Sequence, residues 1–109
     1  MKKHFNDLSA AEDERLACLA EELAEVIQVI CKIQRHGYAS KHPADLNGMT
    51  NRKLLEKELG DVEARICLMV DNGDIHRLTI EEWAEEKYDA FAYLHHQKMP
   101  LPPAPKEDK

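Results

Sequence analysis

The sequence has no long apolar run, no glycine-rich loop and no stretch of alternating polarity that would indicate a β-strand. Its most apolar segment, residues 26–33, is interrupted by Gln28 and Lys32, whereas a membrane-spanning helix needs about 20 apolar residues. The four glycines are isolated from one another, which excludes a glycine-rich phosphate-binding loop. These absences indicate an all-α protein that has no membrane as a partner.

Cysteines and basic residues are also scarce. The three cysteines are odd in number and include no Cys-x-x-Cys pair, which favours reduced thiols in a cytoplasmic protein. With 21 acidic residues against 15 basic ones, the net charge of −6 argues against nucleic acid as a partner. Residues 1–4 are basic, but no apolar run follows them, so we expect no signal peptide.

Three helices are predicted. A capping box at Ser9–Glu12 indicates the start of a first helix of about 27 residues that ends before Gly37. A second helix is expected over residues 51–72. A second capping box, at residues 79–82, indicates the start of a third helix that fades at residues 95–96 and carries Trp83 as a core residue.

The first two helices each carry an apolar seam, in which residues recur at alternating spacings of three and four. The seams comprise Leu16, Leu19, Leu23, Val26, Ile30 and Ile33 on the first helix, and Leu55, Leu59, Val62, Ile66 and Met69 on the second. The first helix has a further apolar strip at Ala20, Ala24, Ile27 and Cys31. Three helices cannot easily cover both surfaces, so we predict an antiparallel bundle of three main helices per chain, completed by homo-oligomerisation. The alternative is a lone helical hairpin with one short helix.

Residues 1–99 are predicted to form one all-α domain. Residues 100–109 contain four of the five prolines together with charged residues, and we expect them to form a disordered tail. The connection over residues 38–50 is longer than most helix–helix loops, which points to a functional role or to mobility.

Two pairs of acidic residues lie at the edges of the two seams. Glu22 and Glu25 share one face of the first helix, and Glu58 and Asp61 share one face of the second, because residues three apart stand together on a helix. If the helices pack antiparallel, the four carboxylates can converge. Such a cluster raises the pKa of its members unless cations neutralise it, and hard divalent cations prefer oxygen ligands. The pattern therefore predicts a metal site.

Each pair taken alone is typical of a solvated helix face, since glutamate is common there. Two such pairs beside two seams are more specific, and Gly60 adds to the pattern. A glycine inside a helix costs about 1 kcal/mol relative to alanine. Close approach of two helices, or room for a ligand, would each explain its presence.

The acidic elements resemble a known family. Glu21-Glu22-Leu23-Ala24-Glu25 followed on the next helix by Glu58-Leu59-Gly60-Asp61 is similar to the EExxE and ExxD elements of the MazG-like nucleotide pyrophosphohydrolases, in the all-α NTP pyrophosphatase superfamily. The resemblance covers roughly residues 16–94. One departure is the long connection of 32 residues between Glu25 and Glu58.

This resemblance implies Mg²⁺-dependent hydrolysis of a nucleoside triphosphate, either a dNTP or a non-standard NTP, to the monophosphate and pyrophosphate, with Mn²⁺ as a possible substitute for Mg²⁺. It implies that the metal ligands are Glu22, Glu25, Glu58 and Asp61. Glu21 and Glu22 would be the catalytic residues, with Glu21 serving as an outer ligand or orienting the attacking water. Metal-assisted phosphoryl transfer suits these groups because it demands positioning and charge neutralisation rather than a protein nucleophile.

The nucleotide substrate also requires cations from the protein. Lys32 and Arg35 follow Glu25 along the first helix, where they are candidates either for contact with phosphate or for pairing with the helix dipole at its C-terminus. Lys87 resembles the phosphate-contacting lysine on the last helix of the family, and a solvated position or a salt bridge is its alternative. Gln28 is a candidate contact for a base or a ribose. The expected assembly is a homodimer or a homotetramer. The rival hypothesis is a non-catalytic helical dimerisation or binding module that retains the fold.

Overall fold

The computed structural model describes residues 5–45 and 47–97, with Ala92 described by its backbone alone. Its helices are α1 (Ala10–His36), α2 (Asn51–Asp71) and α3 (Arg77–Asp89), followed by a short 3₁₀ helix, η1 (Phe91–Tyr93). No strand occurs in the described part of the chain. The prediction of an all-α protein with three main helices is therefore confirmed.

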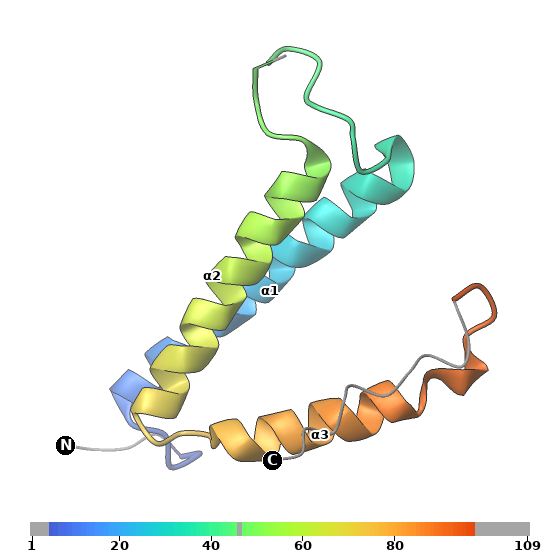
Figure 1. Cartoon of the computed structure of the whole chain (residues 1–109). Helices are drawn as coiled ribbons and strands as arrows, with labels where there is room; N and C mark the ends of the chain where they lie inside the picture. The colour runs from blue at the N-terminus through green and yellow to red at the C-terminus, as the bar shows by residue number, and fades with distance from the viewer. Residues whose placement is uncertain (1–4, 46, 98–109) are drawn as a thin grey trace. The chain divides into compact units, whose positions relative to one another are not determined.

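The chain divides into two compact units, residues 1–74 and residues 75–109. The first unit is a hairpin in which α1 and α2 pack side by side and antiparallel (Figure 1). The second contains α3 and η1. Both acidic pairs lie in the first unit, so the hairpin determines whether they meet.

Both ends of α1 form as the sequence predicts. The Ser9 hydroxyl accepts a hydrogen bond from the Glu12 amide (3.1 Å), and the Glu12 carboxylate accepts one from the Ser9 amide (2.7 Å). This is the predicted capping box, which satisfies two amides that have no partner inside the helix. Gly37 ends the helix with a φ of 89°, a left-handed conformation that glycine adopts without strain.

The second helix also matches its prediction to within one residue. Thr50 caps α2 by accepting a hydrogen bond from the Lys53 amide (3.2 Å). The helix ends at Asp71, and Gly73 follows with a φ of 78°. Beyond it, Asp74 accepts two hydrogen bonds from Arg15, from Nε (2.6 Å) and from Nη2 (2.9 Å). This fork-to-fork pair connects the start of α1 to the end of α2.

The interface between the two helices includes part of the predicted seams. Its buried apolar residues are Val26, Val62 and Met69, which belong to those seams, and Val29, which does not. The prediction was wrong for Leu16, Leu23, Ile30 and Leu59, which are 40–46% exposed. Glu22 and Glu58 lie in the interface instead, each with a side chain only 14% exposed. The exposed leucines and Ile30 leave an apolar edge of the hairpin uncovered, and the carboxylates of Glu22 and Glu58 lie at the helix–helix contact.

Gly60 does not mark a close approach between the two helices of one chain. A Cβ atom at this position would meet no other atom within 4 Å. Of the two explanations expected from the sequence, close packing is therefore wrong within the chain, and room for a ligand stays a prediction.

The second unit differs most from its prediction. The helix α3 begins at Arg77, and the Ile80 amide donates to the carbonyl of His76 (3.1 Å). The capping box predicted at residues 79–82 is wrong because the helical hydrogen bonds already begin upstream of it. The helix ends at Asp89 rather than near residues 95–96. Trp83 is 65% exposed and is not a core residue.

Across the described residues, no helix is both long enough and apolar enough to span a membrane. The predicted disordered tail, residues 100–109, lies outside the described residues.

Candidate metal centre

The four carboxylates predicted to converge do so. Glu22 and Glu25 from α1 meet Glu58 and Asp61 from α2, and one oxygen of each lies within 4.8 Å of the others. The convergence follows from the three-residue spacing within each helix and from the antiparallel packing of the pair. We refer to these four residues as the acidic cluster.

One oxygen of the acidic cluster has no hydrogen-bond partner. Glu58 Oε1 is buried and accepts no hydrogen bond from any described residue. The nearest cation is Lys57, whose Nζ lies 3.7 Å away, outside hydrogen-bonding distance. A buried carboxylate oxygen without a partner is costly, and a bound cation would supply the missing contact.

The pKa values inside the acidic cluster reflect its crowding. The pKa of Glu25 is raised, chiefly by the negative charge of Glu58, then by desolvation and by the charge of Glu22. The pKa of Asp61 is lowered, because its carboxylate accepts a hydrogen bond from Lys57. Ionising all four residues together is therefore unfavourable at Glu25 unless further positive charge is present.

Two basic residues already contact the acidic cluster. Lys57 Nζ lies 3.0 Å from Asp61 Oδ2, and Arg65 Nε lies 3.3 Å from Glu22 Oε2. Four carboxylates and two cations leave a formal charge of −2, which one divalent cation would balance.

Neither of these contacts was predicted from the sequence. The spacing of four residues between Lys57 and Asp61 is typical of an ion pair on one helix. The contact between Arg65 and Glu22 depends on the register of the two helices, which the sequence pattern does not determine.

The donor atoms of the acidic cluster fit a hard divalent cation. All four are carboxylate oxygens, the ligand type that Mg²⁺, Mn²⁺ and Ca²⁺ prefer. Opposite ligands of an octahedral Mg²⁺ stand about 4.2 Å apart and adjacent ones about 3 Å apart, so the four oxygens, now within 4.8 Å of one another, would have to move closer together to share one ion. The residues present could hold a metal ion in this position.

The predicted substrate-binding residues fall into two groups. Gln28, Lys32 and Arg35 line a groove on the hairpin that Glu25 and Glu58 also line. Lys87 lies on α3, in the second unit. Three of the four predicted contacts are thus placed beside the acidic cluster, and the role of each stays a prediction.

Glu21, the remaining predicted catalytic residue, is exposed and is not a member of the acidic cluster. It precedes Glu22 on α1. The pKa of Arg65 on α2 is raised chiefly by its hydrogen bond to Glu22, and the charge of Glu21 adds to this effect. Its catalytic role stays a prediction.

No family model, curated protein or solved structure matches this chain. Interpretation of the site therefore depends on the chain's own residues. These form an all-α protein of three helices with an acidic cluster that could hold a metal ion.

Proposed function

We propose that the protein is a nucleoside triphosphate pyrophosphohydrolase that depends on Mg²⁺ and releases a monophosphate and pyrophosphate from a dNTP or a non-standard NTP. The observation that carries the proposal is the convergence of Glu22, Glu25, Glu58 and Asp61 within 4.8 Å. Their EExxE and ExxD order, which resembles that of MazG-like enzymes, supports the choice of this reaction over other uses of a metal.

In the proposed reaction, the acidic cluster holds Mg²⁺ or Mn²⁺. A bound ion of this kind neutralises phosphate charge and lowers the pKa of bound water. Arg65 fixes the position of Glu22 through its hydrogen bond to Oε2. Glu21 orients the attacking water or acts as an outer ligand. Lys32 and Arg35 contact the phosphates, and Gln28 contacts the base or the ribose. Lys87 is proposed as a further phosphate contact, on the resemblance alone.

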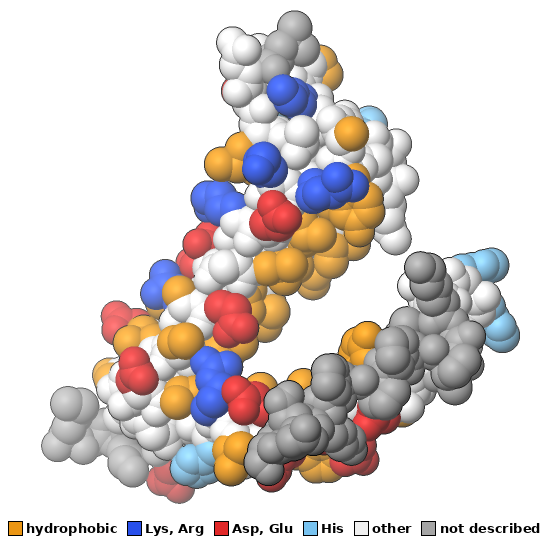
Figure 2. All heavy atoms as spheres, in the orientation of Figure 1, with side chains coloured by type: hydrophobic (Ala, Val, Ile, Leu, Met, Phe, Trp, Pro, Cys, Tyr) orange, Lys and Arg blue, Asp and Glu red, His pale blue; other side chains and the backbone are white. Residues whose placement is uncertain are grey.

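We propose that the active form is a homodimer or a homotetramer. In Figure 2, hydrophobic side chains gather along one edge of the α1–α2 hairpin. Leu16, Leu23, Ile27 and Ile30 lie at spacings that place them on one face of α1, and each is 40–60% exposed. Leu59 of α2 is 46% exposed. A second copy of the chain would bury such a face in a self-complementary interface.

The three cysteines form no disulfide, which is consistent with a cytoplasmic location.

The test of the proposed reaction is pyrophosphate release from a panel of nucleoside triphosphates, with Mg²⁺ or with a chelator. We expect turnover of at least one nucleotide, only with the metal. Asp61→Asn should reduce it about 100-fold or more, because one ligand of the acidic cluster is lost. Asp71→Asn is the matched control, an exposed aspartate of α2 outside the acidic cluster, and should leave activity unchanged.

A non-catalytic helical dimerisation or binding module is the alternative. The ion pairs of Lys57 with Asp61 and of Arg65 with Glu22 favour it, because they already neutralise half of the formal charge of the acidic cluster. This alternative predicts no turnover of any nucleotide and no rise in melting temperature on addition of Mg²⁺. Both results together would refute the enzymatic proposal.

A further inference from the structure

The connection between α1 and α2 encloses a second site that the acidic cluster does not explain. A cavity of about 420 Å³ lies between the end of α1, the loop of residues 37–50 and the start of α2. Its charged and titratable lining residues are Lys32, Arg35, His36, Lys41, His42 and Asp45. We call it the loop cavity.

Basic residues outnumber acidic ones around the loop cavity, in a protein of net charge −6. Its lining includes the cations Lys32, Arg35 and Lys41 and one carboxylate, Asp45. Among the described residues, no carboxylate forms an ion pair with Lys32 or Arg35. These two cations are therefore available to an anion from solution.

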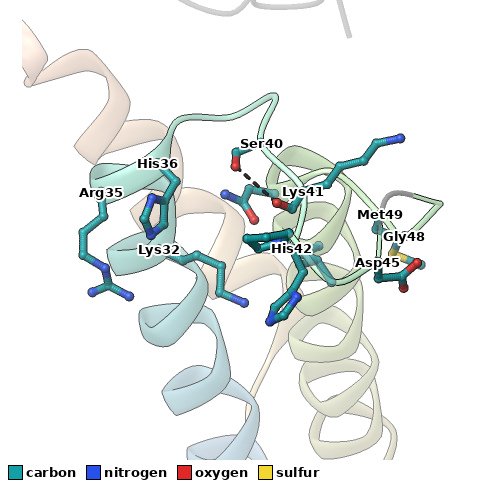
Figure 3. A pocket seen from close by; sticks show the side chains of 12 residues that line it. Lys32, Arg35, His36, Ser40, Lys41, His42, Asp45, Gly48 and Met49 are labelled. Atoms are coloured by element: carbon teal, nitrogen blue, oxygen red, sulfur yellow. Dashed lines mark hydrogen bonds between the residues drawn. The ribbon is translucent and has the colours of Figure 1, made fainter.

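Two side chains point into this space. In Figure 3, Lys32 and His42 extend between α1 and the loop, whereas Arg35 and Lys41 extend away from it. His42 Nδ1 accepts a hydrogen bond from the Ala44 amide (3.1 Å). This bond requires an unprotonated Nδ1, so the neutral ring carries its proton on Nε2 and can donate it to a ligand.

The loop is anchored at its base. The Asn51 amide donates to the Ser40 carbonyl (2.8 Å), and the Arg52 amide donates to the Tyr38 carbonyl (2.9 Å). The Asn51 side chain, only 2% exposed, donates to the Gly37 carbonyl (3.0 Å). These bonds occupy the first amides of α2. Recognition of an anion therefore falls to the side chains of Lys32 and His42 rather than to the helix terminus.

The loop cavity adjoins the groove beside the acidic cluster. Lys32, Arg35 and Leu54 line both. Lys32 follows Glu25 by seven residues, which corresponds to about 10 Å along the helix axis. A ligand bound at the acidic cluster could thus extend along α1 to Lys32 and His42.

We propose that the loop cavity is a phosphate-binding pocket in which Lys32 and His42 contact the phosphate oxygens, and that it receives the pyrophosphate end of the substrate. The ammonium group of Lys32 and the Nε2 donor of His42 favour this end, because the base and sugar of a nucleotide carry no comparable negative charge. The identity of the natural ligand as a nucleotide rests on the proposed function. The affinity of the pocket for phosphate groups does not rest on the proposed function.

The experiment is a calorimetric titration of the full-length protein with inorganic pyrophosphate, in the presence of a chelator so that no divalent cation takes part. Lys32→Gln should weaken binding about tenfold or more, the equivalent of one hydrogen bond to a charged group. His42→Asn should do the same. The asparagine oxygen can still accept the Ala44 amide, so the turn is kept while the Nε2 donor is lost. Lys53→Gln, at an exposed position of α2 outside the loop cavity, is the control and should bind as the wild type does.

Equal affinity in the wild type and in the Lys32 and His42 variants would overturn the proposal, as would absence of binding. Titration with a second ligand, the uncharged nucleoside deoxyadenosine, should show no binding that depends on Lys32 or His42. If it does, the pocket binds the nucleoside instead and the proposal is wrong. Pyrophosphate binding without turnover of any nucleotide would leave the pocket established and refute the enzymatic proposal. Turnover of a nucleotide without pyrophosphate binding would support the enzymatic proposal and refute the phosphate-binding pocket.

Discussion

Glu25 is the residue at which the acidic cluster is most easily tested without a metal. Its pKa lies above the ordinary value of 4.5, because Glu58, desolvation and Glu22 all disfavour its charge. A carboxyl with a raised pKa favours the folded state below its ordinary pKa, and that contribution is lost as the pH rises through the raised value. At neutral pH without divalent cations, ionised Glu25 therefore destabilises the fold.

We expect Glu25→Gln to have a higher melting temperature than the wild type at pH 7 in the presence of a chelator. The difference should shrink as the pH falls and vanish below the ordinary pKa of 4.5, where both side chains are neutral. Thermal unfolding measured over a pH series checks this. A variant that melts below the wild type at pH 7 would show that the charge of Glu25 is not opposed by its neighbours.

We expect Lys57 to compete with a metal ion for the acidic cluster, because its ammonium group forms an ion pair with Asp61 and lies near Glu58. Lys57→Gln should therefore tighten Mg²⁺ binding by roughly fivefold, the affinity equivalent of an exposed ion pair. Calorimetric titration with Mg²⁺ measures the change, and Lys53→Gln on the same helix is the control. Weaker Mg²⁺ binding in the variant would mean that Lys57 supports the site instead of competing for it.

The residues of the acidic cluster were predictable because three-residue spacing within a helix is visible in a sequence. The contacts of Lys57 and Arg65 with the acidic cluster were harder to predict. Arg65 of α2 contacts Glu22 of α1, and Glu22 and Val29 are less exposed than Leu23 and Ile30. Apolar spacing alone favoured Leu23 and Ile30, because it takes no account of which polar residues the facing helix can bind.

At the level of the helix, Gly60 in α2 offers a direct test of packing. A methyl group there meets nothing within 4 Å, and alanine lowers the conformational entropy cost of forming the helix. We expect Gly60→Ala to raise the free energy of unfolding by about 0.5–1 kcal/mol, as measured by urea denaturation. A loss of stability would indicate that another copy of the chain packs against this position.

The boundaries of α1 and α2 could be predicted because residues at their ends bind the backbone locally. Ser9 and Glu12 form their capping box within four residues, and Gly37 ends the helix by its own conformation. The start of α3 could not be predicted, because the side chain of His76 makes no capping hydrogen bond, whereas Thr79 belongs to a residue type that commonly caps helices. The loop cavity was also beyond prediction, since it depends on backbone bonds from α2 to Tyr38 and Ser40.

For the whole molecule, the exposed apolar edge predicts self-association. Leu23→Glu places a charge at the centre of that edge and should convert the assembly to single chains of 12.5 kDa, as measured by light scattering. Ala17→Glu, at an exposed position of the same helix, should leave the mass of the assembly unchanged. A wild-type protein that is already a single chain would refute the oligomeric proposal.

We propose that Glu22, Glu25, Glu58 and Asp61 together bind a divalent cation. A titration with Mn²⁺ followed by electron paramagnetic resonance tests this most directly. We predict a saturable site in the wild type from which Mg²⁺ displaces Mn²⁺. Glu58→Gln should weaken that site about 10-fold to 100-fold, whereas Glu56→Gln, an exposed glutamate of α2 outside the acidic cluster, should not. No saturable site, or equal affinity in the two variants, would contradict the claim.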